Sequence, residues 1–193
     1  RIIDLSNEFR LESSHSFRDR KFIYGLPEYN KKAIENAHNI ANPGCFATAI
    51  QLALLPLAAN RLLTEPAHVN AITGSTGAGA GLSETTHFSW RNNNLSWYKP
   101  FTHQHLGEVL QCLEGLQGER PELLFLPLRG NFSRGIFATA YTNFDGTLEQ
   151  AKALYRTYYQ DARFTFLTDT PPTLKQVVNT NSAHLHLHEH GQV

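Results

Sequence analysis

One cysteine stands where a reactive thiol is favoured. Pro43 and Gly44 form a turn signal, and the uncharged, Ala- and Leu-rich run from Phe46 to Ala58 predicts a buried helix. Cys45 would then lie at a helix N-terminus, where unsatisfied N–H groups and the helix dipole stabilise a thiolate and can hold an oxyanion. We interpret Cys45 as a catalytic nucleophile, and a buried, inert cysteine is the alternative.

A nucleophilic thiol needs a base, and two histidines precede a predicted helix in the segment THQHLGE. His103 and His105 are two residues apart, so in an extended segment they point to opposite sides, and we expect one of them to reach Cys45. A surface pair or a metal-ligand pair is the alternative. Because the chain has no CxxC and no HExxH, we expect no metal site here.

Two other motifs are less specific. The loop GSTGAGAG, from Gly74 to Gly81, lacks both a GxGxxG in phase after a strand and a GK[ST], so it is a weak nucleotide fingerprint. A small-residue loop beside an acyl or nicotinamide group is the better interpretation. In HLHLHEH, from His184 to His190, a strand would place four histidines on one face, which predicts a solvated face more than a metal site.

The composition excludes several classes of protein. The 193 residues are 41% hydrophobic, which is enough for a core, and Lys+Arg and Asp+Glu are both 17, which argues against a nucleic-acid binder. We expect no membrane span, since no apolar run reaches about 18 residues, and no signal peptide. Two cysteines favour a reducing compartment, the cytoplasm. The absence of Met and an opening that reads as an interior strand indicate a fragment.

The elements that must position these residues follow from the hydrophobic pattern. Helices are predicted over Lys31–His38, Phe46–Ala58 (kinked or ended by Pro56), Leu106–Leu116 and Leu148–Tyr159, the last clearly amphipathic. Strands are predicted over Arg1–Leu5, Val69–Thr73, Leu123–Leu128, Gly135–Thr142, Val177–Asn179 and Ala183–His190. Phe22–Asn30 is predicted to be an ordered loop, broken by Gly25 and Pro27. The widely spaced strands indicate an α+β domain with a mixed or mostly antiparallel sheet.

Taken together, these motifs resemble a known family. IANPGCFATAIQLALLP is similar to the active-site signature of the N-acetyl-γ-glutamyl-phosphate reductases, relatives of aspartate-semialdehyde dehydrogenase. IDLSNEFR, FIYGLPEYN, GSTGAGAG, THQHLGE, RGNFSRGIFAT and VVNTN fit other family segments, although Gly107 replaces the usual Pro. The resemblance covers nearly the whole chain. It implies a fold like the C-terminal domain of glyceraldehyde-3-phosphate dehydrogenase, with helices on one face of the sheet.

The resemblance also implies a domain division. Residues 1–40 would be the tail of the dinucleotide-binding domain with a connecting loop, and residues 41–193 the catalytic and dimerisation domain. The N-terminal Rossmann half would be largely missing, and the C-terminal end truncated.

In such enzymes the thiolate attacks the acyl phosphate and expels phosphate, and the thioester is reduced by NADPH to the semialdehyde, in arginine biosynthesis. The implied catalytic residues are Cys45 and His105, with His103 as the second choice of base. The implied substrate-binding residues are Arg10, Glu28, Asn42 and Arg134; for each arginine a structural salt bridge is the alternative, and Glu28 is expected to orient either a histidine or the substrate. The implied NADP(H)-binding residues are Ser75, Thr76, Gly77, Gly79 and Asn179, with Asn181 as a further candidate.

The implied partners are the small acyl-phosphate substrate, inorganic phosphate and further copies of the chain in a homodimer or homotetramer. The acyl group, acetyl or succinyl, stays open. One rival is an acyl-phosphate reductase of lysine biosynthesis. The other is a non-catalytic assembly fragment, because a reductase without its dinucleotide domain has nowhere to hold the cofactor.

Overall fold

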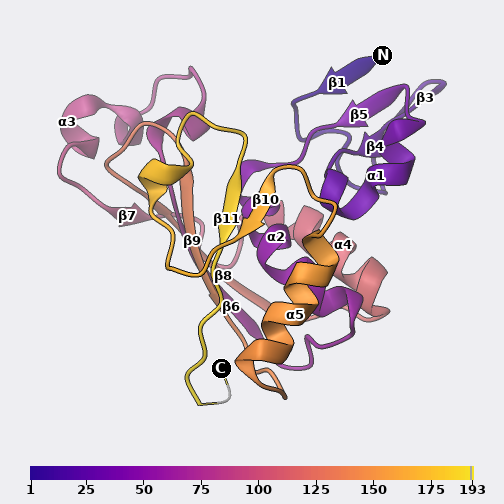
Figure 1. Cartoon of the computed structure of the whole chain (residues 1–193). Helices are drawn as coiled ribbons and strands as arrows, with labels where there is room; N and C mark the ends of the chain where they lie inside the picture. Colours follow the sequence, from indigo (N-terminus) through magenta and orange to yellow (C-terminus); the bar gives the residue numbers. More distant parts are fainter. Residues whose placement is uncertain (192) are drawn as a thin grey trace.

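The computed structural model describes residues 1–191 and 193 and contains two main sheets. The N-terminal one is a small parallel sheet in the order β1-β5-β4, built from β1 (Ile2–Asp4), β5 (Asn39–Ala41) and β4 (Ile23–Tyr24). It carries helix α1 (Pro27–Glu35) and lies at the upper right of Figure 1. A two-residue-per-strand hairpin, β2 (Ser16–Phe17) with β3 (Arg20–Lys21), lies beside it.

The larger sheet has four strands in the order β7-β8-β6-β9. The central strands β6 (Ala67–Thr73) and β8 (Leu123–Arg129) are parallel, while β7 (Ser96–Trp97) and β9 (Ile136–Tyr141) flank them antiparallel. The predicted mixed sheet is therefore confirmed, with both antiparallel pairs at its edges. In β6 every second residue is buried, as expected for a strand that faces a core on one side.

Helices α2 (Cys45–Ala59) and α4 (His105–Gln117) pack on each other and on one face of this sheet. The core between them includes Phe46, Ile50, Val109 and Phe125, all fully or almost fully buried. The uncharged sequence of α2 fits a helix surrounded by protein, as predicted. Helix α5 (Leu148–Tyr159) covers α2 from the other side (Figure 1), so the helices lie together beside the sheet.

Pro56 does not end α2, which continues for three residues beyond it. A proline inside a helix removes the N–H that would bond the carbonyl of residue i−4 and crowds that carbonyl. Here the i−4 residue is Leu52, and its carbonyl accepts a hydrogen bond from the Tyr159 hydroxyl at 2.6 Å. The neighbouring Tyr155 hydroxyl donates to the carbonyl of Ala53. Helix α5 thus supplies the hydrogen bonds that allow the proline inside a buried helix.

Three predictions of secondary structure were wrong. Helix α1 spans Pro27–Glu35, so it begins inside the segment predicted as a loop and ends before His38, while overlapping the helix predicted from Lys31; proline at the first helical position loses no hydrogen bond, so Pro27 can start it. Val177–Asn179 forms a turn after the short helix η3 (Leu174–Gln176), and Asn179 has a positive φ of 64°. The predicted strand Ala183–His190 is only the three-residue β11 (Ala183–Leu185), paired in parallel with β10 (Thr165–Leu167).

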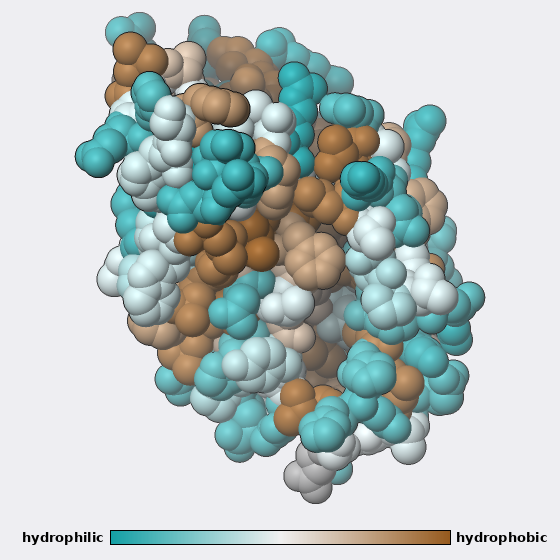
Figure 2. Space-filling view, turned by 90° about the vertical axis from the view of Figure 1, so that its left-hand side faces the viewer, coloured by the Kyte–Doolittle hydropathy of each residue, from teal (hydrophilic) through white to brown (hydrophobic). Residues whose placement is uncertain are grey.

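The remaining chain between β6 and α4 is an excursion of short elements: η1 (Ser75–Ala78), η2 (Glu84–Thr86) and α3 (Phe88–Arg91). Figure 2 shows the side of the molecule that carries α3 and β7, where hydrophobic side chains gather around a hollow with hydrophilic side chains at the rim. Across residues 1–191 and 193, no helix has the length and apolar character needed to cross a membrane. Nor does that part of the chain contain a group of three or more His, Cys, Asp or Glu arranged for a metal ion.

Candidate active site

Cys45 is the first residue of α2, and Gly44 is the N-cap. The thiol is solvent-exposed, as a nucleophile must be, whereas Cys112 in α4 is buried. Loss of solvation raises the pKa of the Cys45 thiol; the backbone N–H groups of Phe46 and Cys45 and the charge of Arg10 act in the opposite direction. The helix terminus therefore lowers the pKa as predicted, but desolvation outweighs it, so the thiol needs a base.

His105 provides an imidazole next to this helix terminus. It is the first residue of α4 and is 7% exposed. A Cβ atom on residue 44 would lie only 2.6 Å from the ring carbons Cδ2 and Cε1 of His105, so the ring occupies the space that a side chain at Gly44 would need. Burial, together with the charges of Arg10 and Lys99, lowers the pKa of His105 to about 4. The ring is therefore neutral at pH 7, with a lone pair that can accept a proton, but the low pKa makes it a weak base as long as these charges are not offset.

His103 has a different environment. Its Nδ1 accepts a hydrogen bond from the backbone N–H of His105 at 3.2 Å, so it satisfies one of the free donors at the start of α4. Its ring lies edge-on to Phe46, Tyr98 and Phe125. Burial, then the charge of His105, lowers the pKa of His103 to about 4. Its Nδ1 is committed to the helix, so the geometry favours His105 as the base.

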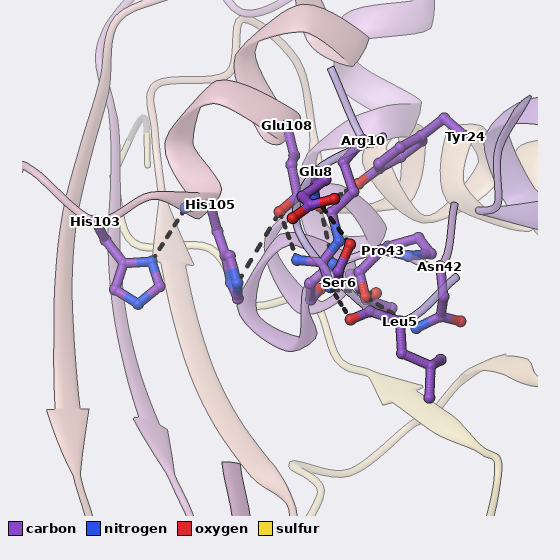
Figure 3. A network of polar contacts seen from close by, with 12 residues as sticks. Leu5, Ser6, Glu8, Arg10, Tyr24, Asn42, Pro43, His103, His105 and Glu108 are labelled. Carbon is purple, nitrogen blue, oxygen red and sulfur yellow. Dashed lines mark hydrogen bonds and ion pairs between the residues drawn. The ribbon is translucent and has the colours of Figure 1, made fainter. Parts of the chain in front are cut away.

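A buried carboxylate, Glu108, lies one turn after His105 and joins the surrounding segments (Figure 3). Oε1 accepts from Arg10 Nη1 at 3.1 Å, and Oε2 accepts from the backbone N–H of Gly44 at 2.8 Å and from Tyr24 Oη at 3.1 Å. Oε1 is also 4.0 Å from His105 Nε2. Sequence reasoning did not include Glu108 or Tyr24 among the site residues. The spacing His105-x-x-Glu108 was the available signal for Glu108, since residues three apart in a helix lie on the same face.

Arg10 is buried and held on two sides. Besides Glu108, it donates from Nη2 to the carbonyl of Leu5 at 3.0 Å, while its Nε has no hydrogen-bond partner among the described residues. Arg10 therefore forms the structural salt bridge that was the alternative to substrate binding, and of its side-chain nitrogens only Nε is left without an acceptor among the described residues. Asn42 is exposed and donates from Nδ2 to the carbonyl of Pro43, so it lies just before the turn that leads into Cys45.

Three other predicted residues have partners elsewhere. Glu28 in α1 accepts from the hydroxyl of Thr165 in β10 at 3.0 Å, and no contact between Glu28 and a histidine is found in the described part of the chain. Arg134 is exposed and approaches the side chain of Asn179 at 3.5 Å. The structure therefore brings together two residues predicted to bind different molecules, substrate and cofactor.

A groove of about 850 Å³ opens beside Cys45. Asn42, Thr48, Thr73, Thr76 and Gly77 line it together with β9 and parts of residues 171–191 and 193. Ser75, Gly79, Arg134 and Asn179 are not among the described residues that line it. The loop after β6 is held against residues 132–135, since the N–H of Ser75 donates to Phe132 O and the N–H of Thr76 to Ser133 O. Its N–H groups there are already used, so its contribution to the groove is the small size of its side chains.

Comparison with known proteins agrees with this architecture. The family described as "Semialdehyde dehydrogenase, dimerisation domain" matches residues 45–193. The chain is 58% identical over 192 residues to an N-acetyl-gamma-glutamyl-phosphate reductase of Christiangramia forsetii and 56% identical to one of Flavobacterium johnsoniae, in each case covering 99% of this chain and 59% of the relative. This chain thus spans about three fifths of the length of these relatives.

Two solved structures share the fold at low sequence identity. The aspartate semialdehyde dehydrogenase of Francisella tularensis has a TM-score of 0.67 at 14% identity, covering 95% of this chain and 64% of that one. Aspartate semialdehyde dehydrogenase II of Vibrio cholerae has a TM-score of 0.61 at 15% identity, covering 92% and 58%. The fold and the match over residues 45–193 lead to one conclusion: the chain belongs to the semialdehyde dehydrogenase family, of which it contains the dimerisation domain.

Proposed function

We propose that this chain carries the acyl-transfer centre of an N-acetyl-γ-glutamyl-phosphate reductase, an NADP-dependent enzyme of arginine biosynthesis. The carrying observation is the pairing of an exposed Cys45 at the start of α2 with a neutral, buried His105 packed against the preceding residue. The relatives at 52–58% identity bear the name of that enzyme.

The chemistry follows from the charge states of the site. His105 takes the proton from the Cys45 thiol as sulfur attacks the acyl carbon, the acyl–phosphate bond breaks, and phosphate leaves with its electron pair. A thioester remains on Cys45. The N–H groups at the start of α2 would stabilise the negative charge that develops on the acyl oxygen. An anionic substrate near Arg10 and Lys99 would offset the charges that lower the pKa of His105 and make it a stronger base.

We propose that the side of the groove next to Cys45 receives the flat ring of the cofactor. Thr73, Thr76 and Gly77 line it, and the space around the Cα of Gly77 is open except for Thr73 Oγ1 at 3.2 Å from the Cβ position. When bound, NADPH supplies the two electrons that reduce the acyl group. We propose that Thr76 and Gly77 flank its ring, with Ser75, Gly79 and Asn179 further from the thiol.

The remaining roles are proposals of the same kind. Asn42, which lines the groove, would contact the substrate beside Cys45, while Arg10, buried and paired with Glu108, would act on it through its charge, and Arg134 would contribute charge at the mouth of the loop. Glu28 would act on the substrate only if its bond to Thr165 opened. Residues 1–40 would belong to the dinucleotide-binding domain and 41–193 to the catalytic domain, and the cytoplasm is the proposed compartment.

The half-reaction tests this proposal without a cofactor. The chain is mixed with N-acetyl-γ-glutamyl phosphate, and covalent acylation is followed by intact-protein mass spectrometry with phosphate release measured in parallel. We expect one acyl group per chain, bound to Cys45, with none on Cys45→Ser and an unchanged yield on Cys112→Ser, since Cys112 is buried. Acylation of Cys45→Ser, or none of the unaltered chain, would contradict the proposal.

We also propose that the sheet face opposite α2 and α4 is the surface on which two copies associate. His68, Asn70 and Ile72 of β6 point away from the buried residues of that strand, and they pair across the sheet with Leu124, Leu126 and Leu128 on one side and with Tyr141, Thr139 and Phe137 on the other. These residues are half-buried or exposed, and Trp97 beside Leu128 is 64% exposed. An apolar sheet face of this kind is typical of an interface.

The oligomeric state tests the surface. Sedimentation of the unaltered chain should give a dimer or a larger assembly, and Leu126→Lys should give a folded monomer. Glu119→Lys, an exposed position after α4, is the control and should leave the assembly intact. A Leu126→Lys protein that stays assembled would place the interface elsewhere.

A further inference from the structure

The Glu108 carboxylate is 3% exposed, and it contacts three other segments of the chain. It receives Arg10 from the segment after β1, Tyr24 from β4 and the N–H of Gly44 from the start of α2. In its own helix it lies beside His105. No other carboxylate in the described part of the chain accepts hydrogen bonds from so many segments.

We propose that Glu108 is a positioning residue of the reaction: it fixes the start of the nucleophile's helix through Gly44 and faces His105, whose protonated form it stabilises, as the third member of a Cys45–His105–Glu108 arrangement. This inference rests on the proposed function and deepens it. Glu108 acts through its neighbours, because its contacts are to Gly44 and His105 rather than to the Cys45 thiol.

The hydrogen bonds of the carboxylate leave room for this role. A carboxylate has about four lone-pair sites, and at most three are used: by Arg10, by Gly44 and by Tyr24, whose single hydroxyl proton is shared with Gln51 Oε1 at 3.0 Å. The remaining capacity is on Oε1, the oxygen that lies 4.0 Å from His105 Nε2. That separation is too long for a hydrogen bond to a neutral ring but short enough to stabilise an imidazolium. Glu108 would therefore become more important once His105 has taken the thiol proton, as an oriented third group does in catalytic triads.

Arg10 offsets the negative charge of the Glu108 carboxylate. Its guanidinium, also buried, compensates the Glu108 charge at 3.1 Å and leaves the pair nearly neutral toward the thiol. The two charges act on Cys45 in opposite directions, since Arg10 favours the thiolate and Glu108 opposes it. Removing one of them therefore has a predictable sign. The titratable and charged groups around the arrangement are Arg10, Tyr24, Cys45, Tyr98, Lys99, His103, His105, Cys112 and Arg129.

The test uses alkylation of Cys45 by iodoacetamide across pH, measured by peptide mass spectrometry on the chain as it is, and acylation by the acyl phosphate as a second readout. In Glu108→Gln the opposing charge is lost and Arg10 is uncompensated. We expect the alkylation midpoint to move down by about half to one pH unit, while acylation slows by about 10- to 100-fold. A residue that only maintained the fold would slow both reactions without this downward shift.

Three further variants keep the result decisive. Glu108→Asp keeps the charge on a shorter side chain, so the midpoint should stay while acylation falls. If Glu108→Gln alone does not fold, because it leaves Arg10 buried and unpaired, the double variant Arg10→Met/Glu108→Gln removes both charges and should return the midpoint to within about 0.3 pH units of the unaltered chain. Tyr24→Phe, which removes a neutral donor to the same carboxylate, is the matched control and should leave the midpoint unchanged.

The two proposals fail in different ways. An unaltered chain that accepts no acyl group would overturn the proposed function, whereas the alkylation midpoints would still test the placement of Glu108. If Glu108→Gln is acylated at the normal rate and its alkylation midpoint is unchanged, Glu108 has no positioning role.

Discussion

The imidazole ring of His105 lies directly over the Cα of Gly44, in the space that any larger residue at position 44 would fill. This contact joins the N-terminus of α4 to that of α2 and sets the ring beside the residue that precedes Cys45. Glycine is required here by the close approach of a side chain, since Gly44 has an ordinary φ of −66°.

Gly44→Ala should therefore displace His105. We expect acylation of Cys45 to slow at least tenfold and the free energy of unfolding to fall by about 1–3 kcal/mol, the usual cost of overpacking. Urea unfolding and the acylation rate measure the two effects. Gly107→Ala in α4 is the control: its Cβ would meet only the flexible side chain of Leu11 at 3.3 Å, so stability should be unchanged or slightly higher. Equal losses in both variants would mean that the His105 contact is not the cause.

Replacing each histidine in turn should distinguish the role of His105 from that of His103. His105→Asn removes the proposed base and should slow acyl transfer by about a hundredfold or more. His103→Asn keeps a side-chain acceptor for the N–H of His105, since an asparagine side chain can accept from the backbone N–H two residues further on, so we expect less than a tenfold loss. The rate of acylation of each variant checks this. A milder effect at His105 than at His103 would exchange their roles.

Stability should fall in mild acid because both histidines are buried and neutral. Their folded-state pKa of about 4 is below the ordinary value of 6.5, so between about pH 6.5 and about pH 4 the unfolded chain binds protons that the folded chain does not. The stabilisation is fully present above pH 6.5 and is lost as the pH falls through this range, on the order of 1–3 kcal/mol for each group. Urea midpoints at pH 7 and pH 5 measure it. His103→Asn should flatten the dependence, and an equally steep slope in that variant would refute the assignment.

Pro56 and Tyr159 should be coupled in stability. Tyr159→Phe leaves the carbonyl of Leu52 buried without a donor and should cost about 1–3 kcal/mol. With Pro56→Ala, the N–H of residue 56 can bond that carbonyl within the helix, so the same Tyr159→Phe change should cost clearly less. A double-mutant cycle by urea unfolding gives the coupling energy. Additive effects would show that the hydroxyl does not replace the missing N–H.

Much of the architecture could be predicted locally. The uncharged run after Cys45 predicted α2, and Leu148–Tyr159 matches α5 at both ends, because long periodic segments specify their own helices. The predictions for short segments were wrong. Val177–Asn179 contains two β-branched residues but lies in a turn with Asn179 in the left-handed region, and Pro27 begins a helix although it appeared to break one. In such segments tertiary contacts outweigh the weak local preference.

The sequence by itself determined which residues have the chemistry, a cysteine at a helix start and a pair of histidines before another helix, and which family they resemble. Only the tertiary structure decided how they act. Packing placed His105 rather than His103 over Gly44, turned the His103 ring so that it accepts the N–H of His105, and turned Arg10 toward Glu108. These contacts join residues up to 98 positions apart, and burial changes their pKa values. Local sequence patterns record neither, because both depend on which surfaces the folded chain brings together.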